Sequence, residues 1–213
     1  MFKLASVLCE YNYLEKDPIT AKYSIGSIFV EIGSTMLRKS DIRTIAKPFM
    51  KELARVTGDT INLMVPSGTK GVYIEVLESE KSARLASKVG GTDPLNISAV
   101  GKILLAYMPQ DQKDYILEVE GLPRTGVNTI TNKDELDVEL TKIRQNGYAI
   151  DDEESTIGAR CVAAPIFDKD KKILAAISVS GLTIDMTMDK LHTIAKLVMD
   201  AAGNISDILY NQF

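Results

Sequence analysis

The chain has 213 residues, of which 45% are hydrophobic and 25% are charged. These proportions are typical of a globular chain that buries a substantial core, so they argue against disorder and against a fibrous repeat. The formal net charge of −4 excludes an overall basic excess of the kind that nucleic-acid-binding domains often carry, although it leaves room for a local basic site.

Two cysteines and one histidine limit the chemistry open to the chain. Cys9 and Cys161 are far apart in the sequence, which fits neither a disulfide framework nor a metal-binding pair. No stretch reaches the ~18 uninterrupted apolar residues of a membrane-spanning helix. The apolar run at the N-terminus is too short for a secretory signal. We therefore expect a cytoplasmic protein with no membrane attachment, no metal and no cofactor.

The first quarter of the chain predicts two helices around a short hairpin, followed by a third helix. Residues 2–11 have the pattern of a short helix, and residues 13–25 form two strand-like pieces around the turn signal Asp17-Pro18. Apolar residues then recur at helical spacing from Ile25. Ser40 and Asp41 favour the start of the next helix, which we expect to end at residues 57–58, so we place a domain boundary at residues 38–42.

The remainder of the chain predicts two hairpins separated and followed by helices. Residues 60–65 and 72–77 form the first hairpin, and residues 161–167 and 173–179 form the second. Helices are expected at residues 98–108 and 111–118, after Asn132 with its capping-box partner Glu135, and at the C-terminus. This order predicts an α+β fold in which helices cover an antiparallel sheet.

Five separated segments carry a family pattern that is specific through their order and spacing. They are Tyr11–Gly26 (YNYLEKDPITAKYSIG), Ala46–Thr60 (AKPFMKELARVTGDT), Ser98–Ala106 (SAVGKILLA), Ile143–Glu154 (IRQNGYAIDDEE) and Gly158–Gly181 (GARCVAAPIFDKDKKILAAISVSG). With these segments the chain resembles the IclR family of bacterial and archaeal transcriptional regulators over nearly its whole length.

The resemblance implies three parts. Residues 1–25 correspond to a partial winged helix-turn-helix, containing the end of the recognition helix and the wing, residues 26–40 to a linker helix, and residues 41–213 to an effector-binding domain of GAF-like fold. Operator DNA is the expected partner of a complete protein, with phosphate contacts from Lys3, Lys16 and Lys22. We expect this chain alone to bind DNA poorly, because helix-turn-helix proteins contact bases chiefly through the N-terminal residues of the recognition helix. A homodimer or homotetramer is also implied.

The resemblance places an effector site in the C-terminal domain, and the residue types fit that task. Ser178 and Ser180 are two residues apart, so on a strand their hydroxyl groups face one side, and they interrupt an apolar run. Cys161 and Ala163 alternate in the same way on the preceding strand, where small side chains leave room for a ligand. Because a buried hydroxyl group needs a hydrogen-bond partner, the serines are candidate ligand contacts.

The start of the helix expected at residues 98–108 is a candidate anion-binding element. Ser98 is expected to cap this helix, which leaves the backbone N–H groups near Ala99 and Val100 free to receive a carboxylate. The resemblance implies a small organic acid as effector, such as a keto acid, a sugar acid or an aromatic acid, and the bulk of Val100 and Leu85 favours a compact one.

Three further positions are assigned by the resemblance. Asp151 stands where the family has an acidic effector-site residue, and an apolar wall is formed by Leu85 and Ala86. Asp151 also belongs to a run of four acidic residues, which is more often a solvated surface. Cys161 also has the simpler interpretation of an inert core residue, and the two serines that of locally bonded edge hydroxyls.

Three classes of function remain after this reading. The leading hypothesis is a ligand-responsive DNA-binding transcriptional regulator, either a repressor or an activator. The second is a detached sensor that acts through protein contacts alone. An enzyme is disfavoured because no serine has a histidine base at a recognisable motif, no glycine loop for phosphate is present, and metal ligands are too few.

Overall fold

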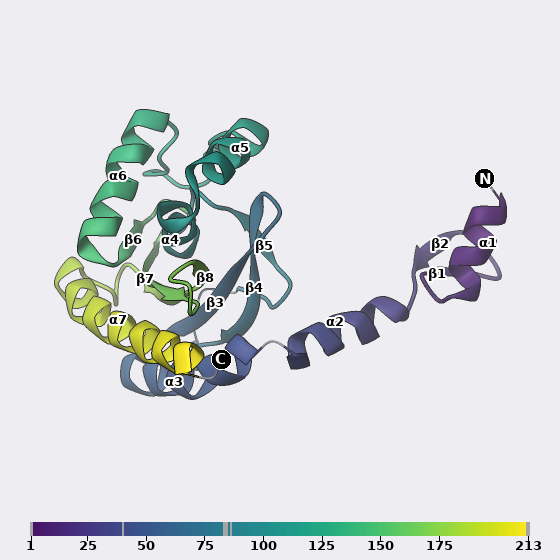
Figure 1. The fold of residues 1–213 in the computed structure, drawn as a ribbon, viewed down its shortest axis with the longest axis horizontal. Helices are drawn as coiled ribbons and strands as arrows, with labels where there is room; N and C mark the ends of the chain where they lie inside the picture. Colours follow the sequence, from purple (N-terminus) through teal and green to yellow (C-terminus); the bar gives the residue numbers. More distant parts are fainter. Residues whose placement is uncertain (1, 40, 83–84, 86, 212–213) are drawn as a thin grey trace. The chain divides into compact units, whose positions relative to one another are not determined.

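The computed structural model describes residues 2–39, 41–82, 85 and 87–211. The chain forms two compact units, residues 1–44 and 45–213 (Figure 1). The predicted division into three parts at residues 25 and 40 stays a prediction.

The N-terminal unit is built around a two-stranded hairpin. Helix α1 (Phe2–Glu10) precedes strands β1 (Leu14–Lys16) and β2 (Tyr23–Ile25), and helix α2 (Ile28–Lys39) follows them. The strands are antiparallel, as predicted. The Asp17 side chain shapes the turn between them, because its Oδ1 accepts hydrogen bonds from the backbone N–H groups of Ile19 and Thr20.

The C-terminal unit contains a six-stranded antiparallel sheet with the strand order β5-β4-β3-β8-β7-β6. The strands are β3 (Thr60–Ser67), β4 (Lys70–Leu77), β5 (Thr92–Pro94), β6 (Ala149–Asp152), β7 (Ala159–Phe167) and β8 (Ile173–Leu182). The helices are α3 (Asp41–Thr57), which enters this unit at Ile45, α4 (Ala99–Tyr107), α5 (Gln110–Glu120), α6 (Lys133–Asn146) and α7 (Met188–Asn211). The predicted α+β fold with flanking helices on an antiparallel sheet is confirmed.

Helices cover both faces of the sheet (Figure 1). On one face, α4 packs against β7 and β8 and also contacts α6. On the other face, α7 packs against β7, and α3 is tied to β4 by an ion pair between Lys47 Nζ and Glu75 Oε2 at 3.4 Å. The apolar cluster between the sheet and α4 buries Ile103, Leu104 and Leu105 with Leu136, Leu140 and Ile143 of α6.

The predicted helices and hairpins are present, and two strands were not predicted. The Asn132 side chain caps α6 by accepting from the N–H groups of Asp134 and Glu135, as its position indicated. Strands β5 and β6 have three and four residues, too short to show an alternating pattern. Strand β6 has the further difficulty that two of its four residues are acidic, and this composition is unusual in a strand.

Candidate functional site

A row of small and polar side chains crosses the centre of the sheet on the face covered by α4. Ser178 of β8 pairs with Asn62 of β3 and with Ala163 of β7, and Ser180 pairs with Cys161. Residues that pair directly across antiparallel strands project to the same face, so these five side chains lie together. Asn62, Ser178 and Ser180 form the polar floor of the site.

The polar floor is held by hydrogen bonds from the Asn62 amide. Asn62 Nδ2 donates to Ser178 Oγ at 3.2 Å and to Ser180 Oγ at 3.0 Å. Asn62 is only 2% exposed, and its Oδ1 is buried without a partner within the described residues. A buried acceptor without a donor is destabilising by roughly 1–3 kcal/mol. The floor is therefore fixed in position and retains a free acceptor.

The N-terminus of α4 forms a second side of the site. Ser98 has extended backbone angles, and its Oγ accepts a hydrogen bond from the N–H of Gly101 at 3.2 Å, so Ser98 is the N-cap. The N–H of Lys102 bonds to the Ser98 carbonyl oxygen. The N–H groups of Ala99 and Val100 have no acceptor among the described residues and can receive an anion at the positive helix end.

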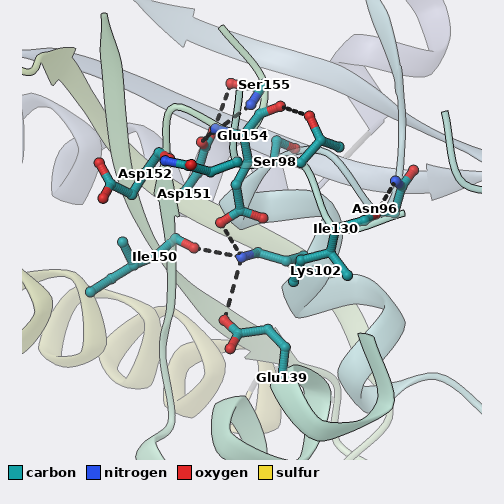
Figure 2. A network of polar contacts seen from close by, with 12 residues as sticks. Asn96, Ser98, Lys102, Ile130, Glu139, Ile150, Asp151, Asp152, Glu154 and Ser155 are labelled. Atoms are coloured by element: carbon teal, nitrogen blue, oxygen red, sulfur yellow. Dashed lines mark hydrogen bonds and ion pairs between the residues drawn. The ribbon is translucent and has the colours of Figure 1, made fainter. Parts of the chain in front are cut away.

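The loop between β6 and β7 forms a third side, and Asp151 organises it (Figure 2). Asp151 is 0% exposed. Its Oδ1 accepts from the N–H groups of Glu154 and Ser155 at 2.8 and 3.3 Å, and its Oδ2 accepts from Ser155 Oγ at 2.6 Å. Both carboxylate oxygens are therefore used within the loop, which places Ser155 and Thr156 against the site.

Lys102 joins the helix to this loop from inside the protein. It is 1% exposed, and its Nζ lies 2.5 Å from Glu154 Oε1, 2.7 Å from the Ile150 carbonyl oxygen and 3.4 Å from Glu139 Oε1 (Figure 2). Burial raises the pKa of Glu154 to about 7, against the lowering effect of the nearby Lys102 Nζ. The helix end and the loop that line the site are thus held together by a buried ion pair.

These three sides enclose a cavity of about 570 Å³. Its wall also includes Leu85, Lys88, and the pair of Tyr73 and Asp93, in which the tyrosine hydroxyl donates to Asp93 Oδ2 at 2.7 Å. A volume in this range is typical of pockets for small molecules. It is larger than a compact three-carbon acid requires, although Val100 and Leu85 both lie in its wall.

The described residues offer little for other kinds of chemistry at this cavity. They contain no group of three or more His, Cys, Asp or Glu side chains arranged to hold a metal ion. Burial raises the pKa of the Cys161 thiol well above its ordinary value, so the thiolate needed for nucleophilic chemistry is disfavoured. What the cavity wall offers is hydrogen-bonding groups, including the backbone N–H groups of Ala99 and Val100.

Comparison with known proteins identifies the family. Residues 34–207 match the family model described as "Bacterial transcriptional regulator IclR C-terminal". The chain belongs to the IclR family. It is 32% identical to the HTH-type transcriptional regulator KipR of Bacillus subtilis, over 96% of this chain and 81% of that protein. It is 30% identical to the HTH-type transcriptional repressor AllR of Escherichia coli, over 98% of this chain and 77% of that protein.

A solved IclR structure has the same fold. The crystal structure of the Thermotoga maritima IclR matches with a TM-score of 0.81 and 35% identity, over 98% of this chain and 84% of that one. The relatives are transcriptional regulators and not enzymes, which agrees with the expectation from the sequence that the chain is not an enzyme. Among the described helices, none has the length and apolar character that a bilayer crossing requires.

Most effector-site residues expected from the IclR resemblance meet at the cavity. Its lining includes Leu85, Ala99, Val100, Cys161, Ser178 and Ser180. Asp151 is not among the lining residues, because its carboxylate is turned into the loop that it organises. Its burial contradicts the interpretation of the acidic run at this position as a solvated surface. Ala86 lies outside the described residues. An effector contact of any of these residues stays a prediction.

The predicted DNA contacts are in the N-terminal unit, away from the cavity residues in sequence. Lys16 ends β1 and Lys22 precedes β2, and both are exposed. Lys16 Nζ lies 5.6 Å from the centre of the Tyr23 ring. The side chain of Lys3 is outside those described. The DNA-binding role of these lysines stays a prediction.

Sequence reasoning missed Asn62 and Lys102. Asn62 is a polar residue in an otherwise apolar part of β3, and it stands opposite a serine across the sheet. Lys102 is the one charged residue of a helix in which residues 99–106 are all buried. For both residues, the signal in the sequence is a polar side chain inside an apolar strand or helix. Such a side chain is buried only where it has hydrogen-bond or ion-pair partners.

Proposed function

We propose that this chain is a ligand-responsive transcriptional regulator whose C-terminal unit senses a small organic acid. The observation that carries the proposal is the pair of free N–H groups at Ala99 and Val100, which open α4 at the cavity wall. A helix N-terminus favours an anion, and a carboxylate is the anion that accepts two such bonds in a compact ligand. The polar floor then contacts the remaining part of the ligand.

A short covalent path connects the cavity to the helices that precede it. Strand β3, which carries Asn62, begins at Thr60, and α3 ends at Thr57. Ligand binding alters DNA affinity only if the ligand favours one of two arrangements of the protein. We propose that a shift of β3 on ligand binding is passed to α3 and then to α2, the helix that follows the β1–β2 hairpin.

We also propose that the regulator is a homodimer or homotetramer that binds operator DNA. Helix α2 supports self-association, because Phe29, Val30 and Ile32 are exposed on it. Apolar residues of this size at helical spacing pair readily with the same residues of a second copy. Light scattering of the purified chain measures its mass directly, and a monomer at micromolar concentration contradicts the proposal.

The ligand class is tested by thermal shift with acids and their amides. Each organic acid in the panel, for example lactate, benzoate and gluconate, is compared with its neutral amide. A ligand that binds only the folded state raises the unfolding midpoint by mass action, so at least one acid is expected to raise it and its amide is not. Amides that match their acids, or no response across the panel, would contradict an organic-acid sensor.

A proline at the first position of α4 tests the helix end itself. Ala99→Pro removes one of the two free N–H groups, and the backbone of Ser98, with φ −132° and ψ 159°, accepts a following proline. The matched control is Lys133→Pro at the first position of α6, where Asn132 is also extended. We expect acid affinity to fall at least about tenfold in the first variant and to stay unchanged in the control.

A further inference from the structure

The cavity wall has a carboxylate oxygen that the described residues leave without a hydrogen-bond donor. Asp93 Oδ2 accepts from the Tyr73 hydroxyl, but Asp93 Oδ1 accepts no hydrogen bond within the described residues. Asp93 lies in strand β5 and lines the cavity opposite the polar floor, whose Ser178 and Ser180 hydroxyls accept hydrogen bonds from the Asn62 amide. A ligand that satisfies this wall must bring hydrogen-bond donors.

The charged residues of the cavity wall also restrict the ligand, because they disfavour a second carboxylate on it. Asp93 is the one acidic residue among the described residues that line the cavity, and it is half-buried. Lys88 is the one basic lining residue, and it is exposed. Water and salt screen an exposed charge more than a partly buried one, so the Asp93 carboxylate dominates the field inside. A second carboxylate on the ligand would face this acid.

We propose that the effector is a hydroxylated monocarboxylic acid, with Asp93 as the residue that determines its specificity. This inference rests on the proposed function, since it takes the carboxylate of the ligand to lie at the N–H groups of Ala99 and Val100. A hydroxyl group of the ligand donates to Asp93 Oδ1, while further ligand oxygens accept from the Ser178 and Ser180 hydroxyls of the polar floor. A keto group supplies no donor, and a dicarboxylate brings a repelled charge.

Matched ligand pairs separate these requirements. D-Gluconate and D-glucarate differ only in the second carboxylate, as do glycerate and tartronate in a shorter frame. Hexanoate has the chain length of gluconate without its hydroxyl groups, and pyruvate replaces the hydroxyl of lactate by a ketone. Dissociation constants are measured by calorimetry on the wild-type chain. The hydroxy monocarboxylate of each pair is expected to bind at least about tenfold tighter, the effect of roughly one hydrogen bond or more.

Asp93→Asn removes the negative charge of this side chain and keeps its hydrogen bond with Tyr73, because an amide oxygen still accepts from the tyrosine hydroxyl. In this variant, the dissociation constant of glucarate is expected to come within about threefold of that of gluconate. Asp170→Asn, in the exposed turn between β7 and β8, removes the same charge outside the cavity. This control should leave the ratio of the glucarate and gluconate dissociation constants unchanged. The unfolding midpoint of each free variant shows that the fold is retained.

The outcomes distinguish this inference from the proposed function. Acids that bind without preference for hydroxyl groups, or keto acids that bind tighter, overturn the inference and leave the organic-acid sensor intact. If glucarate binds tighter than gluconate and this advantage is lost in Lys88→Met, then Lys88 rather than Asp93 sets the charge preference of the cavity. That result also overturns the inference. If no acid binds, both the inference and the proposed function fail.

Discussion

Lys102 and Glu154 form a buried ion pair that joins helix α4 to the loop between β6 and β7, with 2.5 Å between Nζ and Oε1. The helix contributes Ala99 and Val100 to the cavity, and the loop contributes Ser155 and Thr156. Neither segment is fixed by strand pairing at these positions. The ion pair therefore determines how the N-terminal end of α4 faces the opposite wall.

Removing the lysine should destabilise the protein strongly. Lys102→Met leaves the Glu154 side chain buried without its partner, which is destabilising by about 3–5 kcal/mol for a buried pair. Urea unfolding followed by circular dichroism measures this change. Lys133→Met is the matched control, because the pair of Lys133 and Asp114 is exposed and contributes at most about 1 kcal/mol. Equal losses in the two variants would contradict the role given to the buried pair.

The stability of the protein should fall as the pH rises from about 5 to about 8. Burial raises the folded-state pKa of Glu154 to about 7 from an ordinary value of 4.5. The native state therefore binds more protons than the unfolded state in this window, and the contribution is complete below pH 4.5 and lost above pH 7. We expect a decline of roughly 1–3 kcal/mol in the free energy of unfolding.

Glu154→Gln isolates this effect, since glutamine resembles the protonated acid at every pH. The decline between pH 5 and 8 should be much smaller in the variant. Asp151, whose pKa is also raised by burial, remains in both proteins and supplies the common background. An identical pH profile for the two proteins would show that Glu154 is not the titrating group.

Gly126 should not tolerate a side chain. A Cβ at this position would overlap the carbonyl oxygens of Glu153 and Glu154, which belong to the loop beside the cavity. Gly126→Ala is expected to lower the free energy of unfolding by about 1–3 kcal/mol through forced displacement of backbone. Gly203→Ala, in α7 with open space around it, should instead gain about 0.5–1 kcal/mol. A tolerated Gly126→Ala would contradict the close contact.

The sequence predicted the elements whose signals are local. The two hairpins, the Asn132 cap and the long C-terminal helix depend on periodicity, turn residues and capping, all within a few residues of one another. Serine alternation on β8 likewise indicated that Ser178 and Ser180 share a face, and both line the cavity.

The rest of the site depends on contacts between distant segments. Lys102 and Glu154 are 52 residues apart, and Asn62 and Ser178 are 116 apart, so no local pattern pairs them. The acidic run around Asp151 was ambiguous because its local composition resembles a solvated surface. Only the packing of β6 against β7 shows that this carboxylate is buried and bonded to its own loop.

The most direct test of the central claim is calorimetric titration of the acid that gives the largest thermal shift into wild type and Ser178→Ala/Ser180→Ala. The double variant removes both hydroxyl groups of the polar floor. Ser67→Ala, at the exposed end of β3, serves as the control. The account predicts binding by the wild type and the control, and at least about a tenfold weaker affinity in the double variant. Undiminished affinity in the double variant would contradict a binding site at this cavity.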